Sequence, residues 1–561
     1  MSKLPVEVDL LVIGSGAAGM TAALTGSLEG LNVLLVEKRN VVGGTSALSA
    51  GSLWLPNTHL NPYDDDSFEI SLTYLREAIG NRLDQSRARA FLQAAPEMTQ
   101  RLQQEAGLRL RAYPHHPDYL ATLDGATLAG RVLEPEPFDA AVLGSSFADI
   151  APPIPEFTLL GGMMVDRSDI HHLLNAVTKP ASFLHAAKLL ARYGLDRLRH
   201  QRGRRLVMGN ALVARLYHAL LIQGVRVAKG VATTNLIIER GRVKGAELLL
   251  EGQQHRVTAS TGVVLATGGY SHSPELRKQL GSPHLSKVSA VAPGATGDGL
   301  ALAEHCGGQL STNHESVSFW APVSHRQRAD GSTAVFPHIV LDRGKPGALA
   351  IGPDGNRFVN EATTYHPFGE ALFAVKAKSN GGACYLICNN EFVEQYGLGM
   401  VRPKRIGLKP ALRDGYLLKA KSLHELSSKI GVPATSLMAT VERYNGFSKT
   451  GIDEDYAKGA DAYQRNLGDP QHEPNPCIGP LGAPPYYALE LHPGDIGAST
   501  GLVCDDSARV LDGREQPIPG LYACGADAES IMAGRYPGPG ITLGPGMTFG
   551  YIAATHAAAQ G

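Results

Sequence analysis

Cysteine is scarce in this sequence of 561 residues, and its six cysteines form no recognisable motif: Cys306, Cys384, Cys388, Cys477, Cys504 and Cys524. Because CxxC and CxxCH motifs are absent, we expect no disulfide framework, iron–sulfur cluster or haem site. Cys384 and Cys388 lie four residues apart in an apolar run, which allows them to share one face of a strand. Plain core cysteines are the favoured interpretation over a metal pair, and we predict no metal site.

Long apolar runs and an excess of one charge are also absent. No run approaches the roughly 18 residues expected of a membrane span, and the first residues lack the apolar core of a signal peptide. The formal net charge of -1 gives no global reason to expect nucleic acid. With 43% hydrophobic and 19% charged residues, the chain is expected to be a globular, cytoplasmic protein of two or more domains.

Glycine and proline, by contrast, are concentrated in one stretch near the end of the chain. Residues 536–550 contain five glycines and three prolines. Glycine removes the side chain and proline fixes φ, so the stretch is expected to hold bare backbone in one shape beside something large. An apolar helix pattern follows from residue 547. The free N–H groups at the start of that helix would suit a partly anionic ligand group.

The first 40 residues contain a nucleotide-binding pattern. A short apolar strand is followed by Gly14, Gly16 and Gly19 in GxGxxG spacing, an alanine-rich helix and a second strand. Gly14 permits the tight turn, Gly16 lets the backbone approach a pyrophosphate, and Gly19 lets helix and strand pack closely. Glu37 ends the second strand, where it can accept hydrogen bonds from a ribose. The pattern predicts a Rossmann-like unit, which by itself does not separate FAD from NAD.

Further small-residue loops recur along the chain. Residues 38–51 follow the ribose acid directly, a strand at 262–266 runs into Thr-Gly-Gly, and Ala-Thr-Gly-Asp-Gly occupies 295–299. From about 300 the pattern changes to mixed strands and helices without such loops. We therefore expect an α/β protein (α+β overall). Its Rossmann-like FAD-binding domain would be formed by 1–299 and 486–561, with an inserted α+β cap at 300–485 that closes over the site.

Together these motifs resemble the fumarate reductase/succinate dehydrogenase flavoprotein superfamily over nearly the whole chain. The resemblance implies FAD held non-covalently, because members with covalently bound flavin carry a histidine where this loop has Gly44. Asp298 is expected at the sugar-like chain of FAD, Asp527 or Glu529 at its ribityl chain, and the Thr542 and Leu543 N–H groups at the N1/O2 edge of the flavin. The implied FAD-binding residues are Gly14, Gly16, Ala18, Gly19, Glu37, Lys38, Gly43, Gly44, Thr45, Ser46, Ser49, Ala50, Gly51, Ala266, Thr267, Gly268, Asp298, Gly525, Asp527, Thr542 and Leu543.

Two positions depart from the fumarate reductases of that superfamily. Tyr365 stands where those enzymes carry a proton-shuttling arginine, and their dicarboxylate clamp gives way to Arg535 followed by Tyr-Pro-Gly-Pro-Gly. Both departures, with Pro-Asp-Tyr119, resemble the 3-ketosteroid Δ1-dehydrogenases and cyclohexanone dehydrogenases. That resemblance implies that Tyr536 and the Gly540 N–H bind a ketone oxygen. It also implies that Tyr365, with Tyr119 beside it, removes the α proton while flavin N5 accepts the β hydrogen as hydride.

The expected activity is therefore α,β-desaturation (1,2-dehydrogenation) of a cyclic ketone. A 3-oxosteroid is the first expected substrate, and a monocyclic ketone such as a cyclohexanone is the second. A fumarate-reductase-like or enoate-reducing flavoenzyme is the alternative, and a non-catalytic flavin-binding protein is a third interpretation. The electrons would pass to an external acceptor, for which a quinone, a carrier protein and oxygen are all open.

Residues 179–205 form an unusually basic segment, with eight Lys or Arg and one Asp among apolar residues. A solvated helix face is the favoured interpretation. The alternative is a basic amphipathic helix in peripheral contact with a membrane or a partner, which would make the protein membrane-associated. Tyr193 lies in this segment and is a further candidate to line the substrate pocket.

Overall fold

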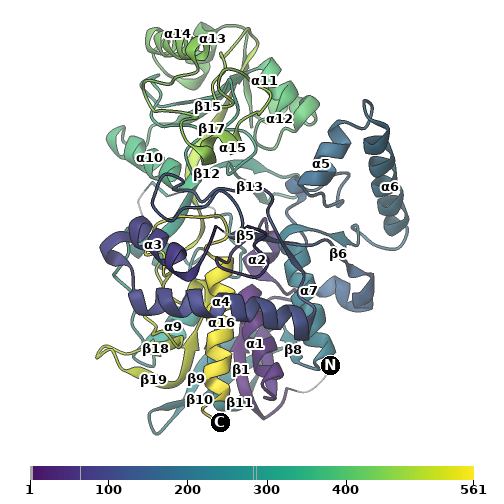
Figure 1. The fold of residues 1–561 in the computed structure, drawn as a ribbon, viewed down its shortest axis with the longest axis vertical. Coiled ribbons are helices and arrows are strands. Elements are labelled where there is room, and N and C mark those ends of the chain that lie inside the picture. Colours follow the sequence, from purple (N-terminus) through teal and green to yellow (C-terminus); the bar gives the residue numbers. More distant parts are fainter. Residues whose placement is uncertain (1–3, 64, 282–283, 286, 288) are drawn as a thin grey trace.

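The computed structural model describes residues 4–63, 65–281, 284, 285, 287 and 289–561. An eight-stranded sheet occupies the lower part of the molecule (Figure 1). An antiparallel pair, β9 (Val231–Glu239) and β10 (Arg242–Leu250), extends it from β11. Its main path runs β18 (Arg509–Leu511), β19 (Pro517–Ala523), β11 (Gln253–Leu265), β1 (Glu7–Ile13), β2 (Val33–Glu37) and β8 (Arg226–Lys229).

The central strands of this sheet are parallel, and their carboxyl ends meet at one edge. Ile13 of β1 pairs with Val36 of β2 and with Leu265 of β11, which pairs in turn with Ala523 of β19. Their apolar sequences fit strands that are covered on both faces. The turns that follow these strands therefore come together, at the edge where open α/β sheets bind ligands.

Helices pack closely on the sheet, and a glycine at the contact between α1 (Ala17–Leu28) and the turn after β1 makes this possible. Helix α16 (Leu543–Ala558, yellow) lies beside α1 (purple) in Figure 1. A Cβ on Gly19 would lie only 2.0 Å from the carbonyl oxygen of Gly14. The other helices of this part are α2 (Gly44–Leu48), α3 (Phe68–Ile79), α4 (Gln85–Ala106), α7 (Met208–Ile222), α8 (Pro274–Leu280) and α9 (Asp298–Glu304).

A second sheet of six strands lies above the first in Figure 1. Its strands are β12 (Ser318–Gln327), β13 (Thr333–Pro337), β14 (Leu349–Ile351), β15 (Cys384–Asn389), β16 (Leu418–Ala420) and β17 (Tyr486–Ala498). Because β17 pairs with β12, β15 and β16, this sheet extends past residue 485, and we place the end of the inserted domain after Ala498. Its helices are α10 (Tyr365–Lys378), α11 (Asn390–Gln395), α12 (Leu408–Arg413), α13 (Leu423–Ile430), α14 (Ala434–Thr450) and α15 (Ala462–Leu467).

Two small sheets complete the fold. One contains β3 (Leu53–Trp54), β5 (Val132–Pro135) and β4 (Leu110–Ala112), and the other pairs β6 (Phe138–Asp139) with β7 (Arg205–Leu206). Between β6 and β7 the chain forms a hairpin of α5 (Arg167–Leu174) and α6 (Pro180–Arg197), which projects on the right of Figure 1. Across the described residues, we find no helix with the length and apolar character needed to span a membrane.

Candidate active site

The glycine–proline loop at 536–540 lies flat against buried Trp54. A Cβ on Gly538 would be 2.7 Å from the indole ring, and one on Gly540 would be 2.3 Å from the carbonyl oxygen of Ser52. Gly540 also has φ +86°, a conformation that favours glycine. The Trp54 N–H donates to the Gly540 carbonyl at 3.2 Å. Glycine is required here because one backbone packs directly on another.

Unpaired backbone donors follow this loop. The N–H groups of Gly540, Ile541, Thr542 and Leu543 donate to no residue that the structure describes. They lie at the start of α16, where such groups carry partial positive charge. Thr542 is exposed although the adjacent Ile541 is buried, so these donors border open space. The arrangement suits a carbonyl oxygen or another partly negative ligand group.

Four buried tyrosines from separate segments meet beside the loop. Tyr365 begins α10 and Tyr463 lies in α15, whereas Tyr119 and Tyr536 come from loops. The Tyr119 hydroxyl donates to the Tyr365 hydroxyl at 3.2 Å. Ring centroids are 4.8 Å apart for Tyr365 and Tyr536, and 4.6 Å apart for Tyr119 and Tyr463. The structure thus brings together the three tyrosines predicted to be catalytic, while their roles stay predictions.

Backbone hydrogen bonds hold Tyr119 against the glycine–proline loop. Its N–H donates to the Pro537 carbonyl at 2.8 Å, and the Tyr74 hydroxyl donates to the same oxygen at 2.6 Å. The preceding Asp118 is buried and accepts from Arg131 at 2.6 Å. The position of the Tyr119 ring is therefore fixed from both sides of the residue.

Burial raises the pKa of all four tyrosine hydroxyls. The pKa values of Tyr536 and Tyr463 rise to about 12, although hydrogen bonds from Tyr365 and Thr542 oppose the rise at Tyr536. For Tyr119 and Tyr365 burial raises the pKa well above 10.0, and the nearby Tyr536 adds to the shift of both. All four hydroxyls are therefore neutral at neutral pH, and a base among them needs help to ionise.

A buried arginine places positive charge behind the cluster. Among the described residues, the Arg343 guanidinium donates to four backbone carbonyls: His338 at 2.7 Å, Glu361 at 2.8 Å, Ile339 at 3.0 Å and Thr363. Carbonyl groups are neutral and do not neutralise the guanidinium, and Asp342 is the neighbouring carboxylate that interacts with it. Burial raises the pKa values of Tyr463 and Tyr119, and the charge of Arg343 opposes part of that rise.

Sequence reasoning missed both Tyr463 and Arg343. Tyr463 occupies the first turn of α15, and Arg343 lies in a loop before β14. Neither belongs to a motif with recognisable spacing. Packing of the second domain against the first brings Tyr463 to Tyr119, whereas folding of the second domain itself brings Arg343 to the segment before Tyr365, so no local signal was available.

The start of α1 provides an open cradle, as the GxGxxG pattern predicts. A Cβ on Gly14 would lie 2.1 Å from the Ala266 carbonyl oxygen, which explains the tight turn. A Cβ on Gly16 would instead meet only Ser46 Oγ, at 3.6 Å. Three N–H groups here donate to no described residue: Gly16, Ala18 and Gly19. A helix start with open space and free donors fits a pyrophosphate.

The predicted ribose acid is anchored beside that cradle. The Glu37 carboxylate accepts from the Ser15 N–H at 3.1 Å and from the Ser15 hydroxyl at 2.5 Å. The Gly43 N–H donates to the Ser15 carbonyl at 3.1 Å, and Ser46 Oγ accepts from the Ala17 N–H at 3.0 Å. The loop after β2 is therefore tied to the start of α1.

The same loop also meets the Thr-Gly-Asp-Gly segment. Lys38 Nζ lies 2.7 Å from Asp298 Oδ2, and Thr45 Oγ1 accepts from the Ala292 N–H at 3.0 Å. A Cβ on Gly44 would find its nearest neighbour at 4.0 Å and one on Gly268 at 3.8 Å. Both glycines therefore border open space, as a flavin cradle requires.

Other predicted cofactor residues make contacts within the protein. The fully buried Asp527 accepts from Thr267 Oγ1 and from the Gly269 N–H, both at 2.9 Å, and so fixes the Thr-Gly-Gly turn. A Cβ on Gly51 would lie 2.6 Å from the nitrogen of Gly209 in α7. Whether these residues also touch FAD stays a prediction.

The remaining predicted residues surround the same edge. The Ser49 hydroxyl donates to the Ser46 carbonyl at 2.8 Å, and the neighbouring Ala50 is exposed. Ala266 and Gly525 follow the carboxyl ends of β11 and β19. Their contacts with FAD likewise stay predictions.

Arg535 and Tyr193 lie away from the tyrosine cluster. Arg535 pairs with Glu315, donates to the Ala78 carbonyl at 3.0 Å and has a side chain that is 45% exposed. The Tyr193 hydroxyl donates to the Leu160 carbonyl at 2.8 Å, within the core of the α5–α6 hairpin. Tyr193 is therefore a structural residue of the hairpin, and its candidacy for the pocket is not supported.

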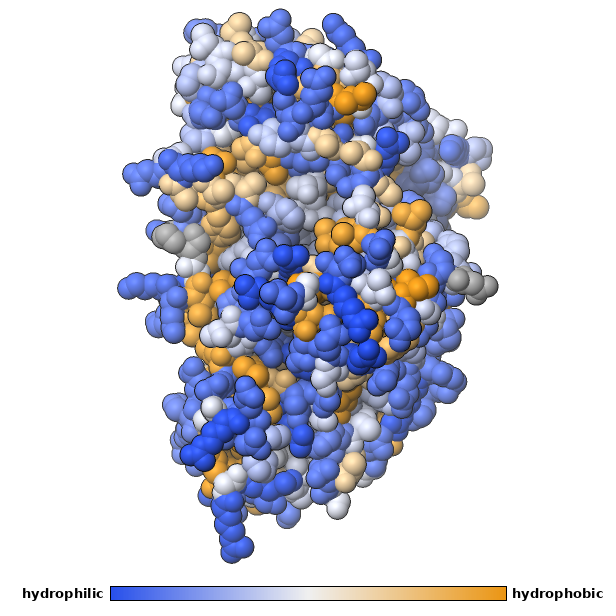
Figure 2. Space-filling view, turned by 60° about the vertical axis from the view of Figure 1, so that its left-hand side comes forward, coloured by the Kyte–Doolittle hydropathy of each residue, from blue (hydrophilic) through white to orange (hydrophobic). Residues whose placement is uncertain are grey.

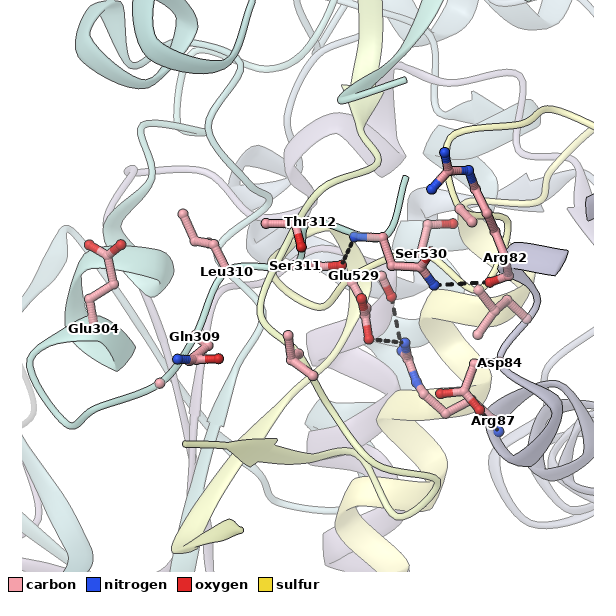
Figure 3. A pocket seen from close by; sticks show the side chains of 15 residues that line it. Arg82, Asp84, Arg87, Glu304, Gln309, Leu310, Ser311, Thr312, Glu529 and Ser530 are labelled. Carbon is pink, nitrogen blue, oxygen red and sulfur yellow. Dashed lines mark hydrogen bonds and ion pairs between the residues drawn. The ribbon is translucent and has the colours of Figure 1, made fainter. Parts of the chain in front are cut away.

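A separate cavity of about 590 Å³ lies near the start of α4 and the segment after β19 (Figure 3). Arg87 and Glu529 form an ion pair of 3.1 Å in its lining, with Arg82 and Ser530 beside them. Glu529, the alternative to Asp527 at the ribityl chain, is thus engaged here. None of the four clustered tyrosines lines this cavity, so it is distinct from the predicted ketone site.

Comparison with known proteins agrees with this geometry. The FAD binding domain family matches residues 9–543. The 4-oxocyclohex-2-ene-1-carboxylate 5-dehydrogenase of Sinomonas cyclohexanicum is 35% identical over 554 residues, covering 98% of this chain and 93% of the relative. The 3-oxosteroid 1-dehydrogenase of Mycobacterium tuberculosis H37Rv is 34% identical over 569 residues, 99% of each chain.

A solved structure is similar over the whole fold. The 3-ketosteroid Δ1-dehydrogenase of Sterolibacterium denitrificans, crystallised with 1,4-androstadiene-3,17-dione, superposes with a TM-score of 0.91. It is 36% identical in sequence, and the match covers 99% of this chain and 100% of that one.

Proposed function

This chain belongs to the FAD-binding flavoprotein family that includes the 3-oxosteroid 1-dehydrogenases, and we propose that it desaturates a cyclic ketone between the carbons α and β to its carbonyl. It is an FAD-dependent oxidoreductase. The observation that carries the proposal is the contact of Tyr119, Tyr365 and Tyr536 beside the loop with the free Gly540 N–H.

Two donors on that loop can polarise the ketone. Loss of an α proton places negative charge on the carbonyl oxygen, which hydrogen-bond donors stabilise. Burial keeps Tyr536 protonated, with a pKa of about 12, and the Gly540 N–H is a second donor four residues on. A donor of this kind contributes about 2.7–4 kcal/mol to catalysis in other enzymes.

Tyr365 is the proposed base for the α proton. Ionising a tyrosine of pKa near 10 at pH 7 costs about 4 kcal/mol, and burial adds to that cost here. The hydroxyls of Tyr119 and Tyr365 share a hydrogen bond, so whichever loses its proton is stabilised by the other. Tyr463 and Arg343 extend this chain with one more hydroxyl and a positive charge.

The residues present fit a non-covalently held FAD. The N–H groups at the start of α1 would hold its pyrophosphate, Glu37 its ribose, and the open glycines Gly44 and Gly268 would border the rest of the molecule. No histidine occurs in the loop at 38–51 to form a covalent link. When bound, FAD supplies the acceptor for the hydride that leaves the β carbon.

Two observations support the proposed substrate class: the engagement of the nearby arginines and the names of the relatives. A dicarboxylate needs a free arginine, whereas Arg535 pairs with Glu315 and Arg343 is committed to backbone carbonyls. This disfavours the fumarate-reductase-like alternative. A 3-oxosteroid is the first proposed substrate and a monocyclic ketone the second, in line with the names of the two relatives. The electron acceptor is proposed to be external: a quinone, a carrier protein or oxygen.

Anaerobic mixing of the purified enzyme with a 3-oxosteroid and, in parallel, with cyclohexanone tests the proposal. The flavin absorbance should bleach with the true substrate class, and the product mass should fall by two hydrogens. The Tyr365→Phe variant should keep its flavin but bleach about 10²–10⁴-fold more slowly. Tyr487→Phe is the matched control, because that buried hydroxyl bonds Asn390 in the second domain.

Two results would contradict the proposal. Bleaching of Tyr365→Phe at the full rate would remove this residue from the mechanism. Failure with every cyclic ketone, combined with reduction of an unsaturated acid, would favour the fumarate-reductase-like alternative.

A further inference from the structure

A cavity of about 390 Å³ beside the second sheet is lined mainly by basic and hydrogen-bonding side chains. Among the lining residues that the structure describes, none is a carboxylate, and five carry an amine or an imidazole: His284, Lys287, His325, Lys376 and His492. The side of the molecule on which α10 lies in Figure 1 comes forward in Figure 2, where the surface is mostly hydrophilic with apolar residues in small groups. The cavity therefore suits an anion better than an apolar ligand.

Lys376, in the last turn of α10, is a buried cation. It is 7% exposed, and its ammonium group donates to the Gly382 carbonyl at 3.2 Å but forms no ion pair with a described residue. The neighbouring carboxylate is Glu490, whose pKa burial raises and Lys376 lowers in part. Glu490 does not line the cavity, and its side chain is 44% exposed. Because a buried charge is costly without a partner, Lys376 favours an anion in the cavity.

Two stacked imidazole rings form another wall of the cavity. His325 of β12 and His492 of β17 have ring centroids 4.6 Å apart and ring planes only 6° apart. Burial lowers the pKa of both rings to about 4, and His492 adds to the shift at His325 while Lys376 adds to it at His492. Both rings are therefore neutral at neutral pH. An anion in the cavity would offset this repulsion and favour their protonation.

Polar side chains of β12 and β13 add neutral hydrogen-bond donors. The Gln327 amide donates to Thr333 Oγ1 at 3.0 Å, which leaves the hydroxyl hydrogen of Thr333 for a ligand. Together with the ammonium groups of Lys376 and Lys287, these donors exceed what the two oxygens of a carboxylate can use. A phosphate group presents more acceptor oxygens and forms charge-assisted hydrogen bonds with such donors.

We propose that this cavity binds a phosphate group, either as free phosphate or as part of a small phosphate monoester. Its volume of about 390 Å³ falls within the range of small-molecule sites, so it has room for an organic part as well. This inference does not depend on the proposed catalytic activity.

Isothermal titration calorimetry of the FAD-loaded, full-length protein tests the inference. Inorganic phosphate and phenyl phosphate are the two probes, at constant ionic strength, and the bound FAD keeps them from the predicted pyrophosphate cradle. Both should bind, and acetate should bind about tenfold or more weakly. Tighter binding of phenyl phosphate would assign the site to a monoester, whereas equal binding would assign it to free phosphate.

A pair of lysine variants locates the binding. Lys376→Met removes the buried charge and should weaken phosphate binding by about tenfold or more. Lys345→Met is the matched control, because Lys345 likewise donates to a backbone carbonyl, that of Gly468 at 2.8 Å, but does not line this cavity. It should bind phosphate like the wild type.

The imidazole pair is tested with sulfate, which keeps its charge while histidine titrates. The wild-type affinity for sulfate should rise about tenfold from about pH 8 to pH 5, because an anion raises the pKa of the rings and acid then favours binding. His325→Gln/His492→Gln should lose most of that rise. The other charged or titratable groups that face the rings are Lys376 of α10, Glu490 of β17 and the lining residues His284 and Lys287.

Three results would overturn the inference. One is the absence of heat from binding at phosphate concentrations up to about 10 mM. Another is equal phosphate affinity of Lys376→Met and Lys345→Met, with flavin content and circular dichroism as the check on folding. If Lys376→Met does not fold, the histidine variant decides, and a wild-type pH dependence in His325→Gln/His492→Gln is the third such result.

Discussion

The Tyr119 hydroxyl lies 3.2 Å from the Tyr365 hydroxyl, although the two residues are 246 positions apart. The bond joins a loop of the FAD-binding domain to the first residue of α10 in the inserted domain. The hydrogen bond therefore links the two domains directly through a pair of buried hydroxyl groups. The pairing makes the ionisation of either tyrosine a property of the cluster.

The rate of flavin bleaching by substrate should rise with pH. Burial raises the pKa of Tyr365 well above 10.0, so the fraction of tyrosinate grows about tenfold per unit between about pH 7 and pH 9. Stopped-flow mixing over this range measures the slope. A flat or falling profile would exclude a tyrosine as the base.

The expected rise in rate between about pH 7 and pH 9 does not come from a change in protein stability. The folded pKa values of these tyrosines lie above their unfolded value near 10, so their contribution to stability is complete below about pH 10 and is lost only above it. Circular dichroism at each pH is the control.

Removal of the Tyr463 hydroxyl should slow the reaction without stopping it. Tyr463→Phe keeps the ring contact with Tyr119 but deletes one of the hydroxyls whose pKa Arg343 lowers. We expect a loss of about tenfold and a rate that rises at higher pH than in the wild type. The pH profile distinguishes this from a packing defect, which would lower the rate equally at every pH.

A methyl group at Gly540 should displace the proposed ketone donor. Its Cβ would lie 2.3 Å from the Ser52 carbonyl oxygen, so the loop must move. We expect Gly540→Ala to lose about 10²–10³-fold in kcat. Gly30→Ala is the matched control, because Gly30 has φ +87° but open space around its Cβ. Equal activities would mean that the Gly540 N–H takes no part.

Alanine substitutions at two glycines of the GxGxxG motif should affect different properties, FAD binding in one and stability in the other. Gly16→Ala adds a Cβ that meets only Ser46 Oγ at 3.6 Å, so the chain should fold but bind FAD about tenfold or more weakly. Gly19→Ala would place a Cβ 2.0 Å from the Gly14 carbonyl oxygen, so it should destabilise the fold itself. Thermal unfolding and flavin content after dialysis separate the two effects. Normal FAD affinity in Gly16→Ala would contradict the placement of the pyrophosphate.

Loss of Arg131 should destabilise the protein because it removes the cationic partner of the buried Asp118. Asp118 accepts from Arg131 at 2.6 Å and from Trp54 Nε1 at 2.8 Å. We expect Arg131→Met to lower the free energy of unfolding by about 3–5 kcal/mol, measured by urea titration. The double variant Arg131→Met/Asp118→Asn should recover part of the loss, and failure to do so would show that the charge is not the cause.

The deficit of Arg131→Met should depend on pH. Burial raises the pKa of Asp118, and Arg131 opposes that rise. A raised folded pKa means that stability is retained at low pH and lost as pH increases, so the deficit should shrink toward about pH 4.

The sequence by itself determined the parts of this protein that depend on neighbours along the chain. The turn at Gly14, the helix start at Gly16 and the bare backbone at 536–540 follow from the conformational freedom of glycine and the rigidity of proline, which are local properties. The order of these motifs also indicated the family and its cofactor, and placed Tyr119, Tyr365 and Tyr536 in one site.

Only the tertiary structure decided which distant surfaces meet. Tyr463 meets Tyr119 through packing between the domains, and Arg343 meets the Glu361 carbonyl through folding of the second domain. Strand β17 belongs to the second sheet because of its partner strands rather than its own sequence. Helical periodicity shows which residues of α6 share a face, but not which face turns toward the protein. In the structure Leu189 and Tyr193 pack inward in the hairpin core, and Phe183 and Leu184 are left outside.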